Sequence, residues 1–282
     1  MEENETELKP SKMQSAKKYA KMILQFAKND LKKRYSGSLL GIFWAYIQPL
    51  IVILVWFVVF EFGLKQHAPL DSNIPFILWL VPAYVGWTYI SDTVLQSANV
   101  LYEYSYLVKK VKFKIEILPL VKIVSSFLIH LFFIAFTMVL YACYIPSYSG
   151  VYFHPTWFQV FYYCFASTCL LTGLSWLVSS LSVFWKDIPH VVNIFLQIGF
   201  WMTPVFWDPA TFSTGKRGII LKILKFNPAY YIVSGYRDCF IGSVPFYNHL
   251  WMTIYFWAFT IVIFFLGLLS FKKLSKHYAD LL

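Results

Sequence analysis

The stretch that decides the fold runs from Ile123 to Trp185 and reads IVSSFLIHLFFIAFTMVLYACYIPSYSGVYFHPTWFQVFYYCFASTCLLTGLSWLVSSLSVFW. Its 63 residues include no Asp, Glu, Lys or Arg. A helix of about 20 mainly apolar residues crosses the hydrocarbon core of a bilayer, so this run is long enough for two crossings. The turn-forming residues 145–150 (IPSYSG) divide it. We therefore expect two membrane-spanning helices here, at about 118–143 and 159–183.

The rest of the chain has the same character, since 59% of its 282 residues are hydrophobic and only 13% are charged. Water-soluble domains are about 45–50% apolar and about 25% charged, so a soluble, disordered or disulfide-scaffold protein is excluded. Further charge-free runs cover 35–60, 72–91, 188–207 and 239–271. Long runs without alternation favour helices over a barrel, because a lipid-embedded backbone must satisfy its own hydrogen bonds. We expect an all-α polytopic membrane protein with six transmembrane helices, at about 42–63, 74–98, 118–143, 159–183, 188–206 and 249–270.

The basic residues are distributed unevenly between the two sides of such a bundle. The segment up to residue 41, the loop at 102–116 and the tail after residue 270, with two flanking lysines, hold 18 of the 24 Lys and Arg residues. Positive-inside bias places this side, and both termini, in the cytoplasm. The net charge of +10 then reflects topology, and we expect no nucleic-acid partner. The expected domains are a cytoplasmic tail with a surface helix (1–41), a six-span transmembrane domain (42–270) and a cytoplasmic tail (271–282).

Residues 16–35 have the pattern of an amphipathic helix. Lysines form one stripe, and apolar residues recur at helical spacing as a second stripe, at Ala20, Ile23, Leu24, Ala27 and Leu31. An interfacial helix buries its apolar face at the acyl boundary and turns its lysines toward anionic headgroups. We therefore expect an N-terminal amphipathic interface helix that contacts membrane lipids. A basic flank that only sets orientation is the alternative.

The segment at 207–248 is rich in Pro and Gly, yet it contains the apolar run 218–226. This run predicts a short helix that ends near Asn227 and Pro228, followed by a second helix from Tyr230 to Phe240. Helices that enter the bilayer without crossing it need protein or water to satisfy their backbone groups. We expect short re-entrant helices in this outer loop before the last span, with a plain amphipathic surface loop as the alternative.

Charged side chains are rare in the predicted spans. Glu61 and Lys122 lie about one turn from the end of a span, and Asp92 lies within reach of the headgroups. We expect all three to reach the interface, although an ionisable group in a span is by default a functional candidate. His130 has no partner at a relay spacing, so proton-coupled transport is disfavoured. The four cysteines form no CxxC or Cys/His spacing, so we expect neither a disulfide framework nor a metal site.

Aromatic residues make up 21% of the chain, more than interfacial belts of Trp and Tyr require. Several lie deep in the predicted spans. Aromatic faces stack on the apolar faces of sugar rings without requiring one pattern of hydroxyls, much as they stack on bases. These residues are therefore candidates for lining a glycan channel, with packing between helices as the alternative. The candidates are Tyr46 in the first span, Tyr84 and Trp87 in the second, and Phe195, Phe200 and Trp201 in the fifth.

Four segments, taken in order, resemble one known family. They are RYSGSLLGIFW (34–44) with IQPL (47–50), LVKKVKF (107–113) with EILPL (116–120), VFWKDIPH (183–190), and NPAYY (227–231) with GYRD (235–238). Together they are similar to the permease subunits of type-2 ABC exporters, and more narrowly to the branch that exports O-antigens, capsules and teichoic acids. The resemblance extends over most of the chain.

The resemblance implies that one subunit forms the channel and a different subunit binds and hydrolyses ATP. No G-x-x-x-x-G-K-[ST] motif occurs in the chain, so ATP and Mg²⁺ would be used by a separate ATP-binding subunit, in two copies, and this chain would need no cofactor and perform no chemistry. Two copies of the permease would enclose the channel, with the first and fifth spans as lining. The cytoplasmic loops would couple to the ATPase through Lys109, Lys110, Lys112, Lys186 and Asp187. The outer gate would include Asn227, Pro228, Tyr231 and Arg237.

We therefore expect the channel-forming permease of an ATP-driven exporter in the bacterial cell membrane. Its substrate would be a lipid-linked polysaccharide, O-antigen-like or teichoic-acid-like, moved out of the cytoplasm. Export of a small lipid or drug by a relative of the same family is an alternative. A membrane-embedded glycosyltransferase or acyltransferase is a remote one, because Asp208 and Asp238 form no DxD pattern and no pair of histidines lies near them.

Overall fold

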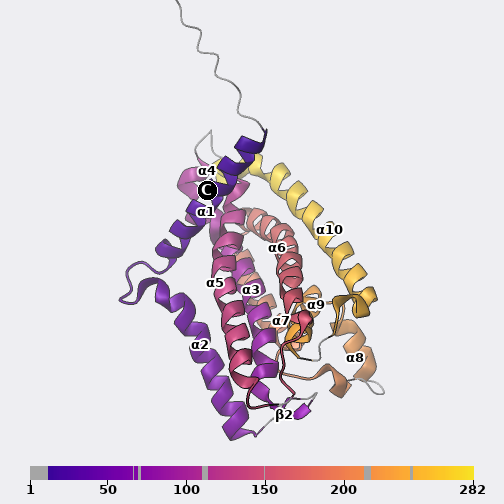
Figure 1. Ribbon diagram of the computed structural model, residues 1–282. Coiled ribbons are helices and arrows are strands. Elements are labelled where there is room, and N and C mark those ends of the chain that lie inside the picture. The colour runs from indigo at the N-terminus through magenta and orange to yellow at the C-terminus, as the bar shows by residue number, and fades with distance from the viewer. Residues whose placement is uncertain are drawn as a thin grey trace, which may run out of the picture.

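A central helix, α3 (Phe76–Glu103), organises the structure, and the other long helices are arranged around it (Figure 1). The computed structural model describes residues 12–65, 67–68, 71–109, 114–148, 150–212, 217–241 and 244–282. α3 follows directly on Pro75, and every residue from Phe76 to Trp87 is buried. A helix that is apolar all round is stable only when other elements cover it on all sides, which explains its central position.

Four helices make the most extensive contacts with α3. They are α5 (Ile117–Tyr144), α6 (Gln159–Phe184), α7 (Ile188–Met202) and α9 (Pro228–Phe240). A further long helix, α10 (Leu250–Leu274), packs along α6. The backbones of α6 and α10 approach closely at two glycines, since a Cβ atom on Gly267 would lie 2.2 Å from the carbonyl oxygen of Gly173. Small residues allow such contact between helices in a membrane, where no hydrophobic driving force brings them together.

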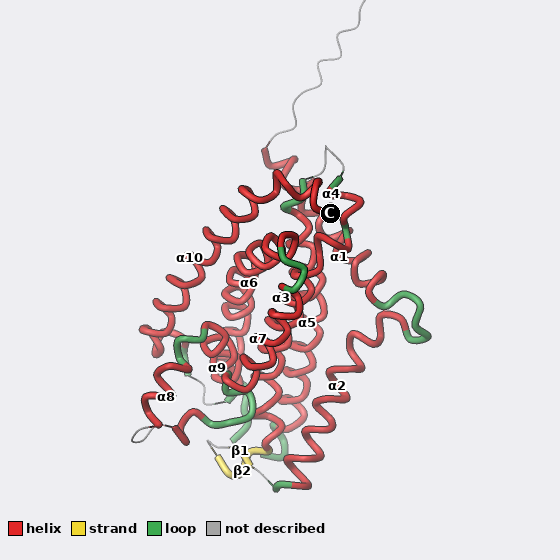
Figure 2. The backbone as a smooth tube through the Cα atoms, turned by 180° about the vertical axis from the view of Figure 1, so that it is seen from behind, coloured by secondary structure: helices red, strands yellow, loops and turns green. Residues whose placement is uncertain are grey.

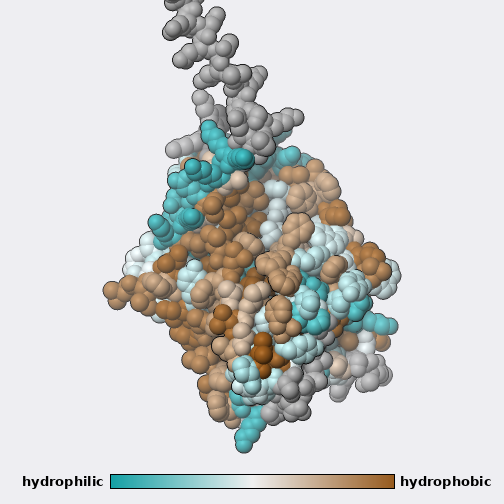
Figure 3. All heavy atoms as spheres, in the orientation of Figure 1, coloured by the Kyte–Doolittle hydropathy of each residue, from teal (hydrophilic) through white to brown (hydrophobic). Residues whose placement is uncertain are grey.

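One long helical segment stands at the edge of the bundle. It comprises the 3₁₀ turn η1 (Gly41–Phe43), α2 (Trp44–Phe57) and the π-helical turn η2 (Val58–Gly63). Much of its apolar surface is exposed, including Leu54 and Phe62. Figure 3 shows hydrophobic side chains covering a broad band of this face of the molecule, with hydrophilic residues gathered along one end. A continuous exposed apolar surface of this kind marks contact with lipid or with another protein.

The short elements gather at the two ends of the bundle (Figures 1 and 2). One end, named here the α4 end, carries α1 (Lys12–Arg34), α4 (Ser105–Val108), η6 (Ser275–His277) and the C-terminal α11 (Tyr278–Leu281). The other, named the β end, carries the antiparallel strands β1 (His67–Ala68) and β2 (Asp71–Pro75). Toward the β end also lie η3 (Pro155–Phe158), η4 (Pro209–Phe212), α8 (Arg217–Leu224), α9 and η5 (Phe246–His249).

The structure is helical, as predicted, and a helix lies at each of the six predicted spans. Within the described residues, four segments are long and apolar enough to cross a bilayer: Gly41–Gly63, Ile117–Tyr144, Pro155–Phe184 and Phe246–His277. α7 is apolar but shorter, and α3 does not reach the same hydropathy. The helices predicted at 218–226 and 230–240 are present as α8 and α9. The small β-hairpin was not predicted, and α10 continues to Leu274, beyond the predicted end at 270.

The predicted amphipathic segment is helical, but its apolar stripe does not face lipid alone. Ala27 and Leu31 are buried, and Ala27 packs with Ile117 and Val121 of α5. Leu24 remains 40% exposed. The lysines of α1 from Lys17 to Lys33 are exposed, as expected from the pattern. The helix is therefore held by protein contacts on one face, and its position at a membrane surface stays a prediction.

Candidate functional site

A cleft of about 610 Å³ lies between α2, α3, α5 and α7. Each helix contributes one face to it, because the lining residues recur at helical spacing. These residues are Trp44, Ala45, Gln48, Pro49 and Val52 of α2; Tyr84, Trp87, Thr88, Tyr89, Ser91, Asp92 and Leu95 of α3; Ser126, Ile129, His130 and Phe133 of α5; and Asn193, Leu196, Gln197, Phe200 and Trp201 of α7, with Arg34 and Tyr35.

α7 has two distinct faces, and only one of them lines the cleft. At about 100° per residue, Asn193, Gln197, Phe200 and Trp201 fall within roughly 100° of one another. Phe195 lies on the far side of the helix and is 69% exposed. It shares that side with other exposed apolar residues, namely Val191, Ile198 and Met202. One face of α7 is thus polar and aromatic, and the other is suited to lipid or to a second protein.

Four of the six predicted channel residues line the cleft: Tyr84, Trp87, Phe200 and Trp201. The indole of Trp87 reaches α7 because Gly199 has no side chain, and a Cβ atom there would lie 2.9 Å from the ring. The remaining two, Tyr46 and Phe195, are not among the lining residues. Tyr46 packs on Phe132 instead, with ring centroids 4.5 Å apart.

The cleft also holds uncharged polar side chains that the sequence reasoning missed. Gln48 projects from α2, and Asn193 and Gln197 project from α7 one turn apart. All three are exposed in the described chain. Their spacing carried a signal, because an amide pair at i and i+4 within an apolar helix marks a polar face. The prediction followed the aromatic residues alone.

His130 lines the cleft and connects it to α9. The ring lies flat against Tyr89 of α3, with centroids 4.4 Å apart and planes inclined by 13°. Its Nε2 is 2.7 Å from the hydroxyl of Tyr236 on α9, and that hydroxyl is 3.2 Å from Sγ of Cys164. The histidine is thus held in one orientation by three helices, which no spacing in the sequence indicated.

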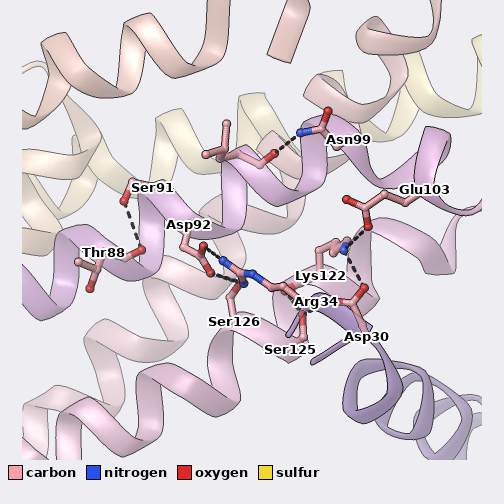
Figure 4. Close-up of polar contacts among 11 residues, drawn as sticks. Asp30, Arg34, Thr88, Ser91, Asp92, Asn99, Glu103, Lys122, Ser125 and Ser126 are labelled. Carbon is pink, nitrogen blue, oxygen red and sulfur yellow. Dashed lines mark hydrogen bonds and ion pairs between the residues drawn. The ribbon is translucent and has the colours of Figure 1, made fainter. Parts of the chain in front are cut away.

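An ion pair lies at the α4 end of the cleft (Figure 4). Both terminal nitrogens of Arg34 donate to the carboxylate of Asp92, one at 3.0 Å, and Ser126 donates to the same carboxylate at 2.9 Å. The carboxylate of Asp92 thus pairs with a residue of this chain and remains partly exposed, and its position relative to the headgroups stays a prediction. A bidentate pair of this kind is a strong and directional contact. It joins the end of α1 to α3.

A second charged cluster fastens α1 to the bundle one turn earlier. Asp30 is 3% exposed and accepts hydrogen bonds from Lys122 at 2.7 Å, Tyr104 at 2.8 Å and Ser125 at 3.1 Å. Lys122 also donates to Glu103 at 2.6 Å. Burial and the hydrogen bond to Asp30 raise the pKa of Tyr104. The expectation that Lys122 reaches the interface was wrong, since its side chain is 2% exposed.

The four residues predicted for an outer gate belong to one packed unit around α9. Asn227 caps the helix by accepting from the amide of Ala229 at 3.0 Å, and Pro228 occupies its first turn. Tyr231 is hydrogen bonded to Tyr162 at 2.9 Å. Arg237 is buried over the ring of Trp79, 3.5 Å from its centroid. Its guanidinium donates to three backbone carbonyls, those of Trp79, Pro204 and Val205.

The residues predicted to couple to an ATPase fall in two neighbouring loops. Lys109 follows α4, and Lys186 and Asp187 connect α6 to α7; all three are exposed. The helix ends that lead into these loops are in contact, because Tyr102 donates to the carbonyl of Ser182 at 2.7 Å, and Val183 belongs to the same buried cluster as Leu107 and Val108. Tyr278 of the C-terminal α11 is buried in the same cluster. Lys110 and Lys112 lie outside the described residues.

Comparison with known proteins gives a consistent result. Residues 22–241 match the family described as ABC-2 type transporter. An O-antigen export system permease protein RfbA of Myxococcus xanthus is 24% identical over 225 residues, which cover 79% of this chain and 81% of the relative. Two proteins of the same name from Klebsiella pneumoniae are 23% and 22% identical over 267 residues, covering 93% of this chain and 95% of each relative. The segment that matches the family includes every helix that lines the cleft.

Proposed function

The chain belongs to the ABC-2 type transporter family, and from this premise we propose that it forms the channel of an ATP-driven exporter of a lipid-linked polysaccharide. It is a multi-pass protein of the bacterial membrane and a transport subunit of the polysaccharide-export branch. The proposal adds the direction of transport, out of the cytoplasm, and the class of cargo. The relatives named for O-antigen export support that class.

The observation that carries the proposal is the lining of the cleft. The aromatic rings of Tyr84, Trp87, Phe200 and Trp201 contribute to this lining, Trp201 being the most exposed at 68%, and amide and hydroxyl groups lie among them. Sugar units present apolar C–H faces and many hydroxyls, so a wall of rings and uncharged polar groups holds them without demanding one fixed pattern. Stacking on aromatic rings tolerates different sequences for the same reason in single-stranded nucleic acid binding. A polymer that must slide requires contacts of this exchangeable kind.

The ATP-binding partner follows from the family, and its arrangement is part of the proposal. Two copies of this chain would enclose the channel and bind two ATPase subunits, which use ATP and Mg²⁺; closed two-fold symmetry is the simple arrangement for such a pair. The exposed apolar faces of α2 and α7 are available for a second copy or for lipid. The ATPase would dock at the α4 end, on the loops that carry Lys109, Lys110, Lys112, Lys186 and Asp187. Both termini would then be cytoplasmic, with six spans.

The remaining elements take roles that fit this orientation. α1 would lie at the cytoplasmic interface, with its exposed lysines toward anionic headgroups. α8 and α9 would enter the outer leaflet without crossing it. The buried guanidinium of Arg237 would hold α9 in place, because its contacts to three carbonyls satisfy backbone groups that lipid would leave unpaired. The outer gate of Asn227, Pro228, Tyr231 and Arg237 would move as one unit.

The test is removal of this chain in the bacterium that makes it. Lipid-linked polymer, pulse-labelled with a radioactive sugar, is expected to accumulate at the cytoplasmic face, and re-expression of the chain is expected to return it to the outside. A Walker-lysine variant of the partner ATPase should give the same accumulation. Normal polymer export without the chain would refute the proposal. A change confined to small lipids or drugs would favour that alternative cargo.

A further inference from the structure

Three amide side chains in the cleft have no partner within the part of the chain that the structure describes. Gln48, Asn193 and Gln197 are exposed, and none of the hydrogen bonds between described residues involves their amide groups. They lie on α2 and α7, two of the four helices that line the cleft. Each amide offers two donors and one acceptor oxygen with two lone pairs. The walls thus present a set of unsatisfied, uncharged donors and acceptors.

Such groups are costly at membrane depth unless something bonds to them. An amide placed in hydrocarbon without a partner loses several kcal/mol on water-to-alkane scales, and polar residues in membrane helices therefore face the bundle interior or a cavity. All three amides do line a cavity, and the outward faces of α2 and α7 are apolar. Their placement is therefore that of a lining that meets water or a hydroxylated cargo, rather than lipid.

Formal charge in the cleft is confined to one end and cancels there. Of the lining residues, only Arg34 and Asp92 carry full charges at neutral pH, and they pair with each other. His130 is turned toward Tyr89 and Tyr236, and neither its hydrogen bonds nor its ring contacts involve a carboxylate. A second copy of the chain would add the same residues. A polymer with one phosphate in every repeat would find no free cation among the lining residues that the structure describes, and a bare anion at low dielectric is strongly disfavoured.

We infer that the cleft is a recognition site for uncharged, hydroxyl-rich sugar units, and that Gln48, Asn193 and Gln197 are the residues that bind their hydroxyls. The inference rests on the proposed function and narrows it, because it excludes a polyol-phosphate chain as the cargo. His130 lines the same cleft, with its ring held by Tyr236. The aromatic rings stack on the sugars, and the amides exchange hydrogen bonds between successive units as the chain moves.

The first test removes the amides without removing their volume. Gln48→Leu, Asn193→Leu and Gln197→Leu are expressed with the ATPase subunit in cells that lack the native chain, and the cell's own polymer is pulse-labelled with a radioactive sugar. Each change is expected to slow export about threefold to tenfold, which corresponds to the loss of one net hydrogen bond. The matched control is Asn99→Leu, an amide of α3 outside the cleft that bonds to its own helix at 3.3 Å. It should export at the wild-type rate.

The second test distinguishes an uncharged cargo from an anionic one. Gln197→Lys and Gln197→Glu place opposite charges at one point of the wall. An uncharged glycan predicts that both variants lose export by similar factors, whereas a polyanion predicts that Lys maintains or raises the rate and Glu abolishes it. Gln197→Asn keeps the amide and should retain most of the export, which separates loss of the hydrogen bond from failure to fold.

Two outcomes overturn the inference while the proposed function survives. One is wild-type export in all three leucine variants with normal expression. The other is opposite effects of Lys and Glu at position 197. If the wild-type chain does not restore export in the deletion strain, the proposed function itself fails. Measurement of the labelled polymer therefore distinguishes failure of the inference from failure of the proposed function.

Discussion

Replacing Lys122 by Met should destabilise the protein more than any other single change in the charged clusters. The side chain is 2% exposed, and its Nζ lies 2.7 Å from Asp30 and 2.6 Å from Glu103. Methionine fills similar volume but leaves the carboxylate of Asp30, itself 3% exposed, with only two hydroxyl donors. Removing one partner of a buried ion pair costs about 3–5 kcal/mol, because the remaining charge is left uncompensated.

The reciprocal change, Asp30→Asn, should cost less. The new amide oxygen still accepts from Tyr104 or Ser125, and Lys122 keeps Glu103, which is 38% exposed and well hydrated. One weakened hydrogen-bond network of this kind costs about 1–2 kcal/mol. The double variant should then be more stable than the sum of the single effects predicts, by at least about 1 kcal/mol, because Asp30→Asn removes the charge that Lys122→Met leaves unpaired.

The assay is reversible unfolding of the purified permease in mixed micelles, followed by Trp fluorescence, for both single variants, the double variant and the control Lys109→Met. The control removes an exposed lysine and should change the free energy of unfolding by less than about 0.5 kcal/mol. Equal losses for Lys122→Met and Asp30→Asn, or strictly additive effects in the double variant, would refute the reasoning. The buried ion pair would then contribute no more to the free energy of unfolding than an exposed pair does.

Three further changes test separate parts of the structure. Gly267→Ala should lower the free energy of unfolding by about 1–3 kcal/mol, because the new methyl group would lie 2.2 Å from the carbonyl oxygen of Gly173. The control is Gly63→Ala, whose new methyl group has no neighbour nearer than 4.0 Å. Equal thermal midpoints for the two variants would contradict the close approach of α6 and α10. Arg237→Met removes the bonds to three carbonyls and should increase proteolysis around α9; unchanged cleavage would show that other contacts hold this helix. Trp201→Ala should reduce polymer export by about fivefold, as expected for loss of one stacking partner, with the ATPase still co-purifying; wild-type export would make the ring a packing residue.

Much of the fold was predictable because the cost of removing a segment from water depends directly on how many charged residues it contains. A charge-free run such as 123–185 has few stable states other than helices in a membrane, and the helices α5 and α6 begin and end within a few residues of the predicted spans. The outer segment was predictable for a local reason. Asn227 and Pro228 were predicted to separate two short helices, and the second of them, α9, begins at Pro228, two residues before the predicted start.

The site was predictable only in part, because lining a cleft depends on which face of a helix meets its neighbours. By residue type and by depth in the predicted span, Trp201 and Phe195 are equally good candidates for lining the cleft. Only the packing of α7 on α3 decides that Trp201 lines the cleft and that Phe195 lies on the far side of the helix. The spacing of the amide residues Asn193 and Gln197 indicated the direction of that face in advance, but the prediction considered only the aromatic rings.

The sequence by itself therefore determined that this chain lies in a membrane, where its helices form and which family it resembles, since these depend on local composition and short segments. Tertiary structure alone decided how distant charges pair. Arg34 meets Asp92, and Asp30 meets Lys122, across 58 and 92 residues of sequence. No local pattern encodes such a partner, because a buried charge is stabilised by whichever opposite charge the packing of the helices brings within hydrogen-bonding distance.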